Sequence, residues 1–185
     1  MPVLDETWTA ERVRALPDDG KRYECIDGVL VVTPSPRTPH QRVVTELLAT
    51  LHFYARRVGG YEAFSSPSDI ELDPRTLVQP DVFVVPFVNG RRFRTWPEIP
   101  LPALVIEVLS PSTARVDRGR KRQRFQRAGV PEFWIVDVDA ALVERWRPTD
   151  ERPEVVSGPI TWQPPGAAEP YTFDLPACLA EWDAD

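Results

Sequence analysis

The fold is decided by residues 78–137, which contain VQPDVFVV (78–85), ALVIEVLSPST (103–113), the basic segment DRGRKRQRFQRAG (117–129) and PEFWIVD (131–137). Residues 81–85 and 103–109 are predicted to be apolar strands. Each strand carries one carboxylate, Asp81 or Glu107, that a buried strand has no packing reason to hold. Burying an unpaired charge costs several kcal/mol, so both carboxylates require a partner or a metal ion.

The two carboxylates are expected to converge on one point. Side chains alternate along a strand, which places Glu107 on the same face as Val105 and Leu109. Asp81 follows Pro80 and therefore stands at the mouth of its own strand. If the strands are neighbours, the pair suits a hard divalent cation, Mg²⁺ or alternatively Mn²⁺, between which two carboxylates do not discriminate.

A basic helix is predicted over residues 116–128, with Gly129 ending it. One stripe of this helix at helical spacing holds Asp117, Lys121, Phe125 and Ala128. Phe125 and Ala128 mark the face that packs on the sheet, so Lys121 points inward as well. The chain has two lysines, Lys21 and Lys121, and a compact ammonium at this position suits a role beside a scissile phosphate or a metal-bound water.

The distribution of charge matters more than the net charge. The formal net charge of −6 counts against a nucleic-acid partner. However, residues 115–127 hold seven basic side chains and one acidic one, which gives this segment +6 and the rest of the chain −12. Arg118 and Arg122 are the candidate contacts to nucleic acid on this patch. A helix face that pairs with acidic neighbours is the alternative.

In order along the chain, the residues read E…QPD…(V/I)EVLSPST…D…K…(Y/F)…AGV.E(F/Y)WIVD. Over residues 23–147 this order resembles the Uma-type family of restriction endonucleases, a divergent branch of the PD-(D/E)XK nuclease superfamily. The resemblance implies an α/β (α+β) fold of the restriction-endonuclease type, a mixed sheet flanked by helices. It also implies metal-dependent cleavage of phosphodiesters.

The resemblance also implies roles for individual residues. Asp81 matches the motif Asp, and Glu107 matches the acidic residue of the (D/E)XK element. Leu109 stands where the usual pattern has Lys, and in this branch Lys121 of the following helix takes that place. Glu24 matches a further acidic position and is expected to support the metal site.

The remaining elements are predicted from local signals. An N-terminal β-hairpin covers residues 21–33 around the turn Asp27-Gly28 and carries Glu24, for which a salt bridge to Arg22 is an alternative role. A long helix follows over residues 39–58. His40, near its start, resembles a family position and could approach phosphate there; a surface or capping histidine is the alternative.

Several loops and peripheral segments have less specific signals. Residues 61–72 are expected to form one extended segment that turns at 73–74 into the Asp81 strand. In residues 89–102, arginines alternate with aromatic residues, which fits either a nucleic-acid contact or an ordinary ordered loop. The hydroxyls of residues 110–113 could bind phosphate or order their loop. Short helices are expected at residues 9–16, capped by Thr9, and near the C-terminus.

Composition favours one domain, residues 1–185, in a soluble cytoplasmic protein. No window has eighteen consecutive apolar residues, and the N-terminus lacks the pattern of a signal peptide. Cys25 and Cys178 are far apart in the sequence, which argues against zinc and gives no support for a disulfide scaffold. A homodimer is left open, with Trp8 and Trp182 as candidate contacts.

Three hypotheses follow. The first is a Mg²⁺-dependent endonuclease acting on DNA, with Asp81 and Glu107 holding the ion and Lys121 acting on the water or the developing charge. The second is a catalytically inactive module on the same fold that binds nucleic acid or another partner. The third treats Asp81, Glu107 and Lys121 as a buried salt-bridge triad in a structural protein.

Overall fold

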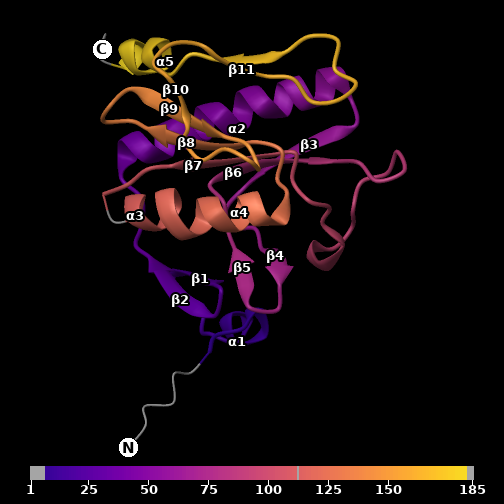
Figure 1. Cartoon of the computed structure of the whole chain (residues 1–185), viewed down its shortest axis with the longest axis vertical. Helices are drawn as coiled ribbons and strands as arrows, with labels where there is room; N and C mark the ends of the chain where they lie inside the picture. Colours follow the sequence, from indigo (N-terminus) through magenta and orange to yellow (C-terminus); the bar gives the residue numbers. More distant parts are fainter. Residues whose placement is uncertain (1–6, 112, 183–185) are drawn as a thin grey trace, which may run out of the picture.

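A central sheet of six strands, in the order β10-β9-β8-β7-β6-β3, organises the molecule (Figure 1). The computed structural model describes residues 7–111 and 113–182. The bounds of the strands are Tyr61–Ser65 (β3), Val82–Pro86 (β6), Leu104–Val108 (β7), Phe133–Asp137 (β8), Leu142–Trp146 (β9) and Glu154–Val156 (β10). Strands β7 and β8 run parallel, and the other neighbouring pairs run antiparallel. The mixed α+β fold class is therefore confirmed.

Strands β6, β7 and β8 lie at the centre because their side chains are apolar on both faces. The β7 strand is buried at all five positions. Strands β6 and β7 are direct neighbours, with Val82 opposite Ile106. The condition for Asp81 and Glu107 to converge is thus met.

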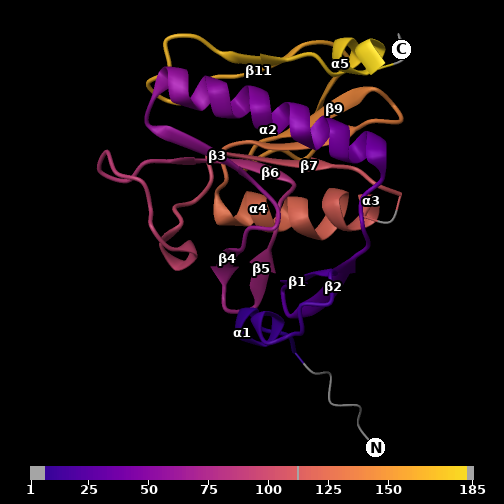
Figure 2. The same cartoon turned by 180° about the vertical axis from the view of Figure 1, so that it is seen from behind.

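One face of the sheet is covered by α2 (Thr38–Val58) and α5 (Leu175–Trp182), together with the hairpin of β11 (Ile160–Trp162) and β12 (Tyr171–Phe173) (Figures 1 and 2). The predicted long helix is confirmed, and its buried residues recur at helical spacing: Val43, Val44, Leu47, Leu51, Tyr54 and Ala55. The C-terminal helix is also confirmed, whereas the strand β12 was not predicted.

The opposite face is covered by a helical segment in three parts: α3 (Ala114–Val116), a π-helical turn η2 (Asp117–Lys121) and α4 (Arg122–Ala128). Gly129 ends it in the left-handed conformation, φ +81°. The predicted helix is therefore present, but it begins two residues earlier. Its π turn has no counterpart in a pattern of 3.6 residues per turn.

A second sheet, in the order β2-β1-β5-β4, packs beyond α4 (Figure 2). Its strands are Arg22–Ile26 (β1), Val29–Thr33 (β2), Ile70–Asp73 (β4) and Thr76–Val78 (β5). The predicted hairpin is β1–β2, and its turn residues Asp27 and Gly28 both have positive φ, as the Asp-Gly dipeptide indicates. Helix α1 (Ala10–Arg14) lies against this sheet, and Thr9 caps it through the Arg12 N–H.

The extended segment expected over residues 61–72 is wrong as a single element. Strand β3 belongs to the central sheet, β4 to the second sheet, and the chain leaves one for the other at residues 66–69. The turn after Asp73 leads into β5, so it does not lead into the Asp81 strand. Alternation alone cannot show which sheet a short strand joins, because that choice depends on tertiary packing.

The expected exposed tryptophans are half-buried instead. Trp8 packs against the cluster beside α1, with the Arg12 guanidinium 4.9 Å from its ring centre. Trp182 packs on the main core, with Arg42 at 5.7 Å. Neither presents the open apolar surface that was expected of a dimer contact. In the described part of the chain, no helix combines the length and apolarity needed to cross a membrane.

The Arg-rich segment 89–102 is an ordered loop on the side of the molecule opposite α3 (Figures 1 and 2). It contains the short helix η1 (Trp96–Glu98). Its two aromatic rings, Phe93 and Trp96, lie 5.4 and 5.6 Å from the ring of Phe64 on β3. These rings pack on each other, which favours the ordinary-loop interpretation.

Two glycines of the helical segment give a matched stability test. Replacing Gly129 by Ala should destabilise the protein by about 1 kcal/mol, because an L side chain is strained at positive φ even with open space around it. Replacing Gly119 by Ala should stabilise it by about 0.5–1 kcal/mol, because that backbone is helical and a Cβ meets no atom within 4 Å. Urea unfolding measures both. The assignment of Gly129 as the helix terminator is contradicted if the two substitutions act alike.

Candidate active site

The carboxylates predicted from the sequence lie across from each other between β6 and β7. The register that pairs Val82 with Ile106 places Asp81 opposite Glu107. Asp81 is 2% exposed and Glu107 is 1% exposed. Glu107 shares its face with Val105 and Leu109, as strand alternation predicts. The sheet therefore sets two carboxylates side by side in the interior.

Lys121 joins these carboxylates from the π turn η2. Its Nζ lies 2.9 Å from Glu24 Oε1 and 3.0 Å from Glu107 Oε1. A fourth carboxylate, Asp117, lies 3.8 Å from the same nitrogen. Burial lowers the pKa of Lys121, but the charges of Glu107 and Glu24 outweigh burial and raise the pKa well above its ordinary value. The ammonium is thus charged, although it is 2% exposed.

Asp81 is held by three donors on the other side of the cluster. Arg22 Nη1 donates to Oδ1 at 2.9 Å, and the Val108 N–H donates to Oδ2 at 3.0 Å. His40 Nε2 lies 3.1 Å from Oδ2. Burial raises the pKa of Asp81, but the hydrogen bond from His40 and the charge of Arg22 outweigh burial and hold the pKa well below the usual range. Asp81 is therefore ionised.

The buried cluster carries more negative than positive groups. Four carboxyl groups, Glu24, Asp81, Glu107 and Asp117, face two permanent cations, Arg22 and Lys121. Burial and the neighbouring carboxylates raise the pKa of Glu107, and burial likewise raises that of Asp117. If all four carboxyl groups were ionised, two negative charges would have no cation. Protons or one divalent ion could neutralise them.

Sequence reasoning brought together Asp81, Glu107, Lys121 and Glu24, but it missed two members of the cluster. Asp117 was placed on the inward stripe with Lys121 and given no role; its spacing of four residues from Lys121 was the available signal. Arg22 was considered as a partner of Glu24, whereas it pairs with Asp81. Strand alternation places Arg22 on the face of Glu24, which was the signal for it.

His40 is not the surface or capping residue considered as its alternative role. It is 8% exposed and lies against Asp81, with its Nδ1 buried and without a hydrogen-bond partner. The π-helical turn and the start of α2 thus approach the cluster from opposite faces of the sheet.

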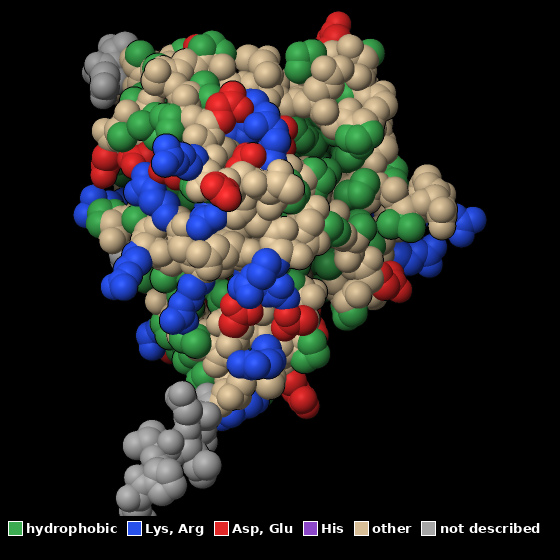
Figure 3. All heavy atoms as spheres, in the orientation of Figure 1, with side chains coloured by type: hydrophobic (Ala, Val, Ile, Leu, Met, Phe, Trp, Pro, Cys, Tyr) green, Lys and Arg blue, Asp and Glu red, His purple; other side chains and the backbone are tan. Residues whose placement is uncertain are grey.

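The candidate nucleic-acid contacts Arg118 and Arg122 lie on the outer face of the helical segment. Arg118 pairs with Asp137 and Glu144, each at 2.7 Å, and Arg122 lies 4.3 Å above the ring of Trp146. Figure 3 shows basic and acidic side chains adjacent over much of this face. The geometry favours the alternative of a paired helix face.

The donor set fits a hard divalent cation, although a rearrangement is required to bind one. Within residues 7–111 and 113–182, no three His, Cys, Asp or Glu side chains are already arranged around a metal position. The Lys121 ammonium lies between Glu24 and Glu107 instead. Glu24 Oε2 and Asp117 Oδ1 are buried without a hydrogen-bond donor, and carboxylate oxygens are the ligands that Mg²⁺ prefers.

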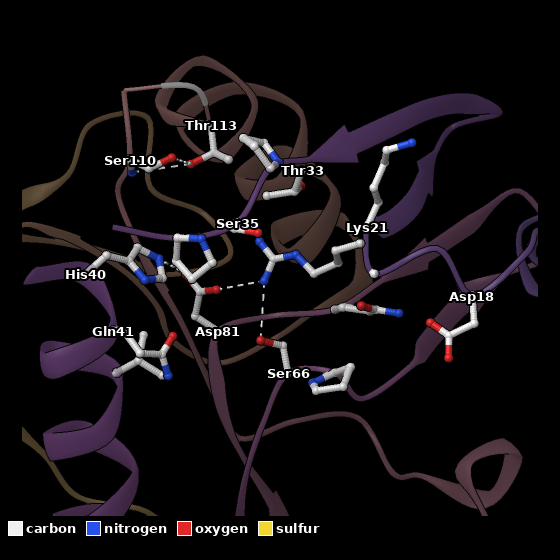
Figure 4. Close-up of a pocket in the computed structure, with 17 residues that line it drawn as sticks. Asp18, Lys21, Thr33, Ser35, His40, Gln41, Ser66, Asp81, Ser110 and Thr113 are labelled. Carbon is white, nitrogen blue, oxygen red and sulfur yellow. Dashed lines mark hydrogen bonds and ion pairs between the residues drawn. The ribbon is translucent and has the colours of Figure 1, made fainter. Parts of the chain in front are cut away.

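A cavity of about 540 Å³ opens beside Asp81 (Figure 4). Arg22, His40 and Asp81 form its inner wall. Ser110 and Thr113 line it as well, and their hydroxyl oxygens lie 3.0 Å apart. Ser112, between them, lies outside the described residues. Both roles considered for the hydroxyl groups of this loop, phosphate binding and ordering of the loop, stay predictions.

The raised pKa of Glu107 predicts how stability depends on pH. Folded Glu107 binds a proton at pH values where the unfolded chain has lost it, so its contribution to stability falls as pH rises above about 4.3, the ordinary Glu value. Replacing Glu107 by Gln removes this penalty, and Lys121 keeps Glu24 as a partner. We expect the stability of the variant, relative to that of the parent, to rise as the pH increases from 4 to 8, because only the parent loses this contribution.

Urea unfolding in EDTA at several pH values measures this difference. Asp139→Asn serves as the control, because Asp139 is exposed, and it should leave the pH profile unchanged. A relative stability of the Gln variant that stays constant or falls over this range would show that the ion pair with Lys121 outweighs burial.

Comparison with known proteins places the chain in a family. A family model described as "Putative restriction endonuclease" (Uma2) matches residues 10–179. A search of curated proteins finds no match. A solved structure from Anabaena variabilis, titled as "a putative nuclease belonging to DUF820", shares the fold with a TM-score of 0.75 and 21% sequence identity, over 94% of this chain and 98% of that one. The chain, with its mixed sheet and its Asp81, Glu107 and Lys121, belongs to the Uma2 restriction endonuclease family.

Proposed function

We propose that the chain is a divalent-metal-dependent nuclease that hydrolyses phosphodiester bonds of DNA. The observation that carries the proposal is the excess of buried carboxylates in a cluster whose Asp81 lines a cavity. A structural core has no reason to keep four carboxyl groups against two cations, because buried charge is costly. A site that binds a cation and a phosphate does have that reason.

Asp81 and Glu107 are the residues that would hold the cation, with Glu24 as a supporting carboxylate. Asp117 adds a further carboxylate beside Lys121. When bound, a Mg²⁺ ion neutralises the phosphate and lowers the pKa of a coordinated water. Mn²⁺ has the same ligand preference and is the practical probe.

The remaining roles belong to side chains of this chain alone. Arg22, His40 and the Val108 N–H fix the orientation of Asp81. We assign to the Lys121 ammonium, which lies 3.0 Å from Glu107, the role of orienting the attacking water or stabilising the negative charge that develops on the phosphate. Its permanent charge suits electrostatic stabilisation better than proton transfer.

A non-catalytic binding module on the same fold is the competing function. It is favoured by one observation: the Lys121 ammonium already neutralises Glu24 and Glu107 from within. The family resemblance supports the nuclease instead, since it matches Asp81, Glu107 and Lys121 together. Homodimer formation and a cytoplasmic location stay predictions from the sequence.

Metal binding and cleavage are expected to separate the roles of these residues. Asp81→Asn should weaken Mn²⁺ binding at least about tenfold, which corresponds to 1.4 kcal/mol, and should abolish cleavage of plasmid DNA. Lys121→Met should keep Mn²⁺ binding but lower cleavage about 100-fold or more, because it removes a charge that acts on the reacting groups. Calorimetry and a gel assay measure the two quantities.

Asp139→Asn is the matched control and should bind and cleave like the parent. Removing one partner of a buried ion pair can unfold a protein, so each variant is first checked by circular dichroism and thermal melting. Undiminished metal-dependent cleavage by a folded Asp81→Asn variant would contradict the assignment of Asp81 as a residue that holds the cation. A parent protein that binds no Mn²⁺ would establish the non-catalytic module.

A further inference from the structure

Asp81 is the carboxylate of the buried cluster that lines the cavity. Glu24, Glu107 and Lys121 are at most 2% exposed, so none of them meets solvent directly. Of the cluster and its contacts, Arg22, His40 and Asp81 line the cavity. A phosphate that approaches the carboxylates therefore passes the Arg22 guanidinium, whose Nη1 donates to Asp81 Oδ1 at 2.9 Å and to Ser66 Oγ at 3.3 Å.

The cavity has the size of a small-molecule site. Its volume of about 540 Å³ falls in the range of pockets that enclose a small organic ligand, roughly 300–1,000 Å³. Its lining comes from separate parts of the chain: residues 34–36 before α2, residues 66–67 after β3, and Ser110 and Thr113 after β7, with Asp18, Gly20 and Lys21 before β1. A duplex carries its phosphates on the outside of a stiff cylinder and cannot follow a strand into such a pocket, whereas an unpaired nucleotide can.

The lining suits a nucleotide in its chemistry. Hydroxyl groups line it from all sides: Thr33, Ser35, Ser66, Ser110 and Thr113. Lys21 and Arg22 are the cations of the lining, paired with Asp19 and Asp81 respectively, and Asp18 is a further carboxylate. Gln41 and Gln79 supply amides. Phosphate and sugar oxygens accept hydrogen bonds from these groups, and the amides can both donate to and accept from a base edge.

Three of the six arginines of the helical segment are paired with carboxylates. Arg124 pairs with Asp73 and Asp27, Arg127 pairs with Asp27, and Arg118 pairs with Asp137 and Glu144. Duplex binding draws on many basic groups along the phosphate backbone. In the described part of the helical segment, the arginines without an ion pair are Arg115, Arg120 and Arg122, and Arg122 lies on Trp146.

We propose that the cavity beside Asp81 takes one unpaired nucleotide, so that the protein binds single-stranded or locally unpaired DNA in preference to duplex. The choice of a nucleotide as the occupant rests on the proposed nuclease function. The preference for an unpaired strand rests on the size of the cavity and on the pairing of Arg118, Arg124 and Arg127 with carboxylates.

Equilibrium binding tests this preference without requiring cleavage. A fluorescent oligonucleotide, used alone or annealed to its complement, is titrated with the protein in EDTA and followed by anisotropy. We expect the single strand to bind at least about tenfold more tightly than the duplex. Equal binding of the two, tighter binding of the duplex, or no binding of either overturns the proposal.

A variant that fills the cavity tests where the strand binds. Ser35 is exposed in the loop before α2, so Ser35→Trp adds bulk to the cavity without disturbing the core. This variant should lose single-strand binding about tenfold or more, whereas Ser35→Ala should bind like the parent. Ser35→Trp that binds as tightly as the parent contradicts the cavity as the binding site.

The two proposals fail separately. Preferential binding of the single strand without any cleavage in Mn²⁺ would support the cavity as a single-strand binding site and contradict the proposed nuclease activity. Cleavage of duplex DNA at least as fast as of the single strand would support the proposed nuclease activity and contradict the proposed preference for unpaired DNA.

Discussion

The Lys121 ammonium is the contact on which the rest of the interior depends. It meets Glu24 from β1 and Glu107 from β7, so a single cation joins the small sheet, the central sheet and the helical segment between β7 and β8. Two salt-bridged carboxylates at 2.9 and 3.0 Å offset much of the cost of burying the ammonium. Val105, on the face of Glu107, and Phe125, one helical turn after Lys121, belong to one buried apolar cluster, and an interior of low dielectric constant strengthens such ion pairs.

The same cluster also limits the stability of the fold. Charge that is left over in a low-dielectric interior opposes folding, and burial raises the pKa of Glu107 and of Asp117. Proteins keep such arrangements where chemistry requires them. The π turn η2 agrees with this view, because π turns within helices are frequent at functional sites and this one brings Asp117 and Lys121 to the same buried cluster.

The sequence was most informative where a charged residue stood in a segment predicted to be buried. Asp81 and Glu107 could be predicted because a carboxylate in an apolar strand conflicts with burial, and Lys121 because it stood on an inward stripe. Arg22 could not be assigned with the same certainty, since alternation gives the face of a strand but not the partner across a tertiary interface. The prediction that residues 61–72 form one extended segment was wrong for the same reason, because alternation does not show that β3 and β4 join different sheets. The paired state of Arg118 depends on β8 and β9, which no local pattern connects to the helix.

The order of the cluster along the chain has a consequence for synthesis. Glu24 is made first, then Asp81 and Glu107, and the cation that joins two of these carboxylates follows only at position 121. Until Lys121 has left the ribosome, docking of the β1–β2 hairpin on the central sheet would bury carboxylates that lack their main counter-charge. Domains generally fold as units during synthesis. Here the hairpin, although translated early, can take its final position only after two thirds of the chain exists, so the nascent protein completes the cluster late.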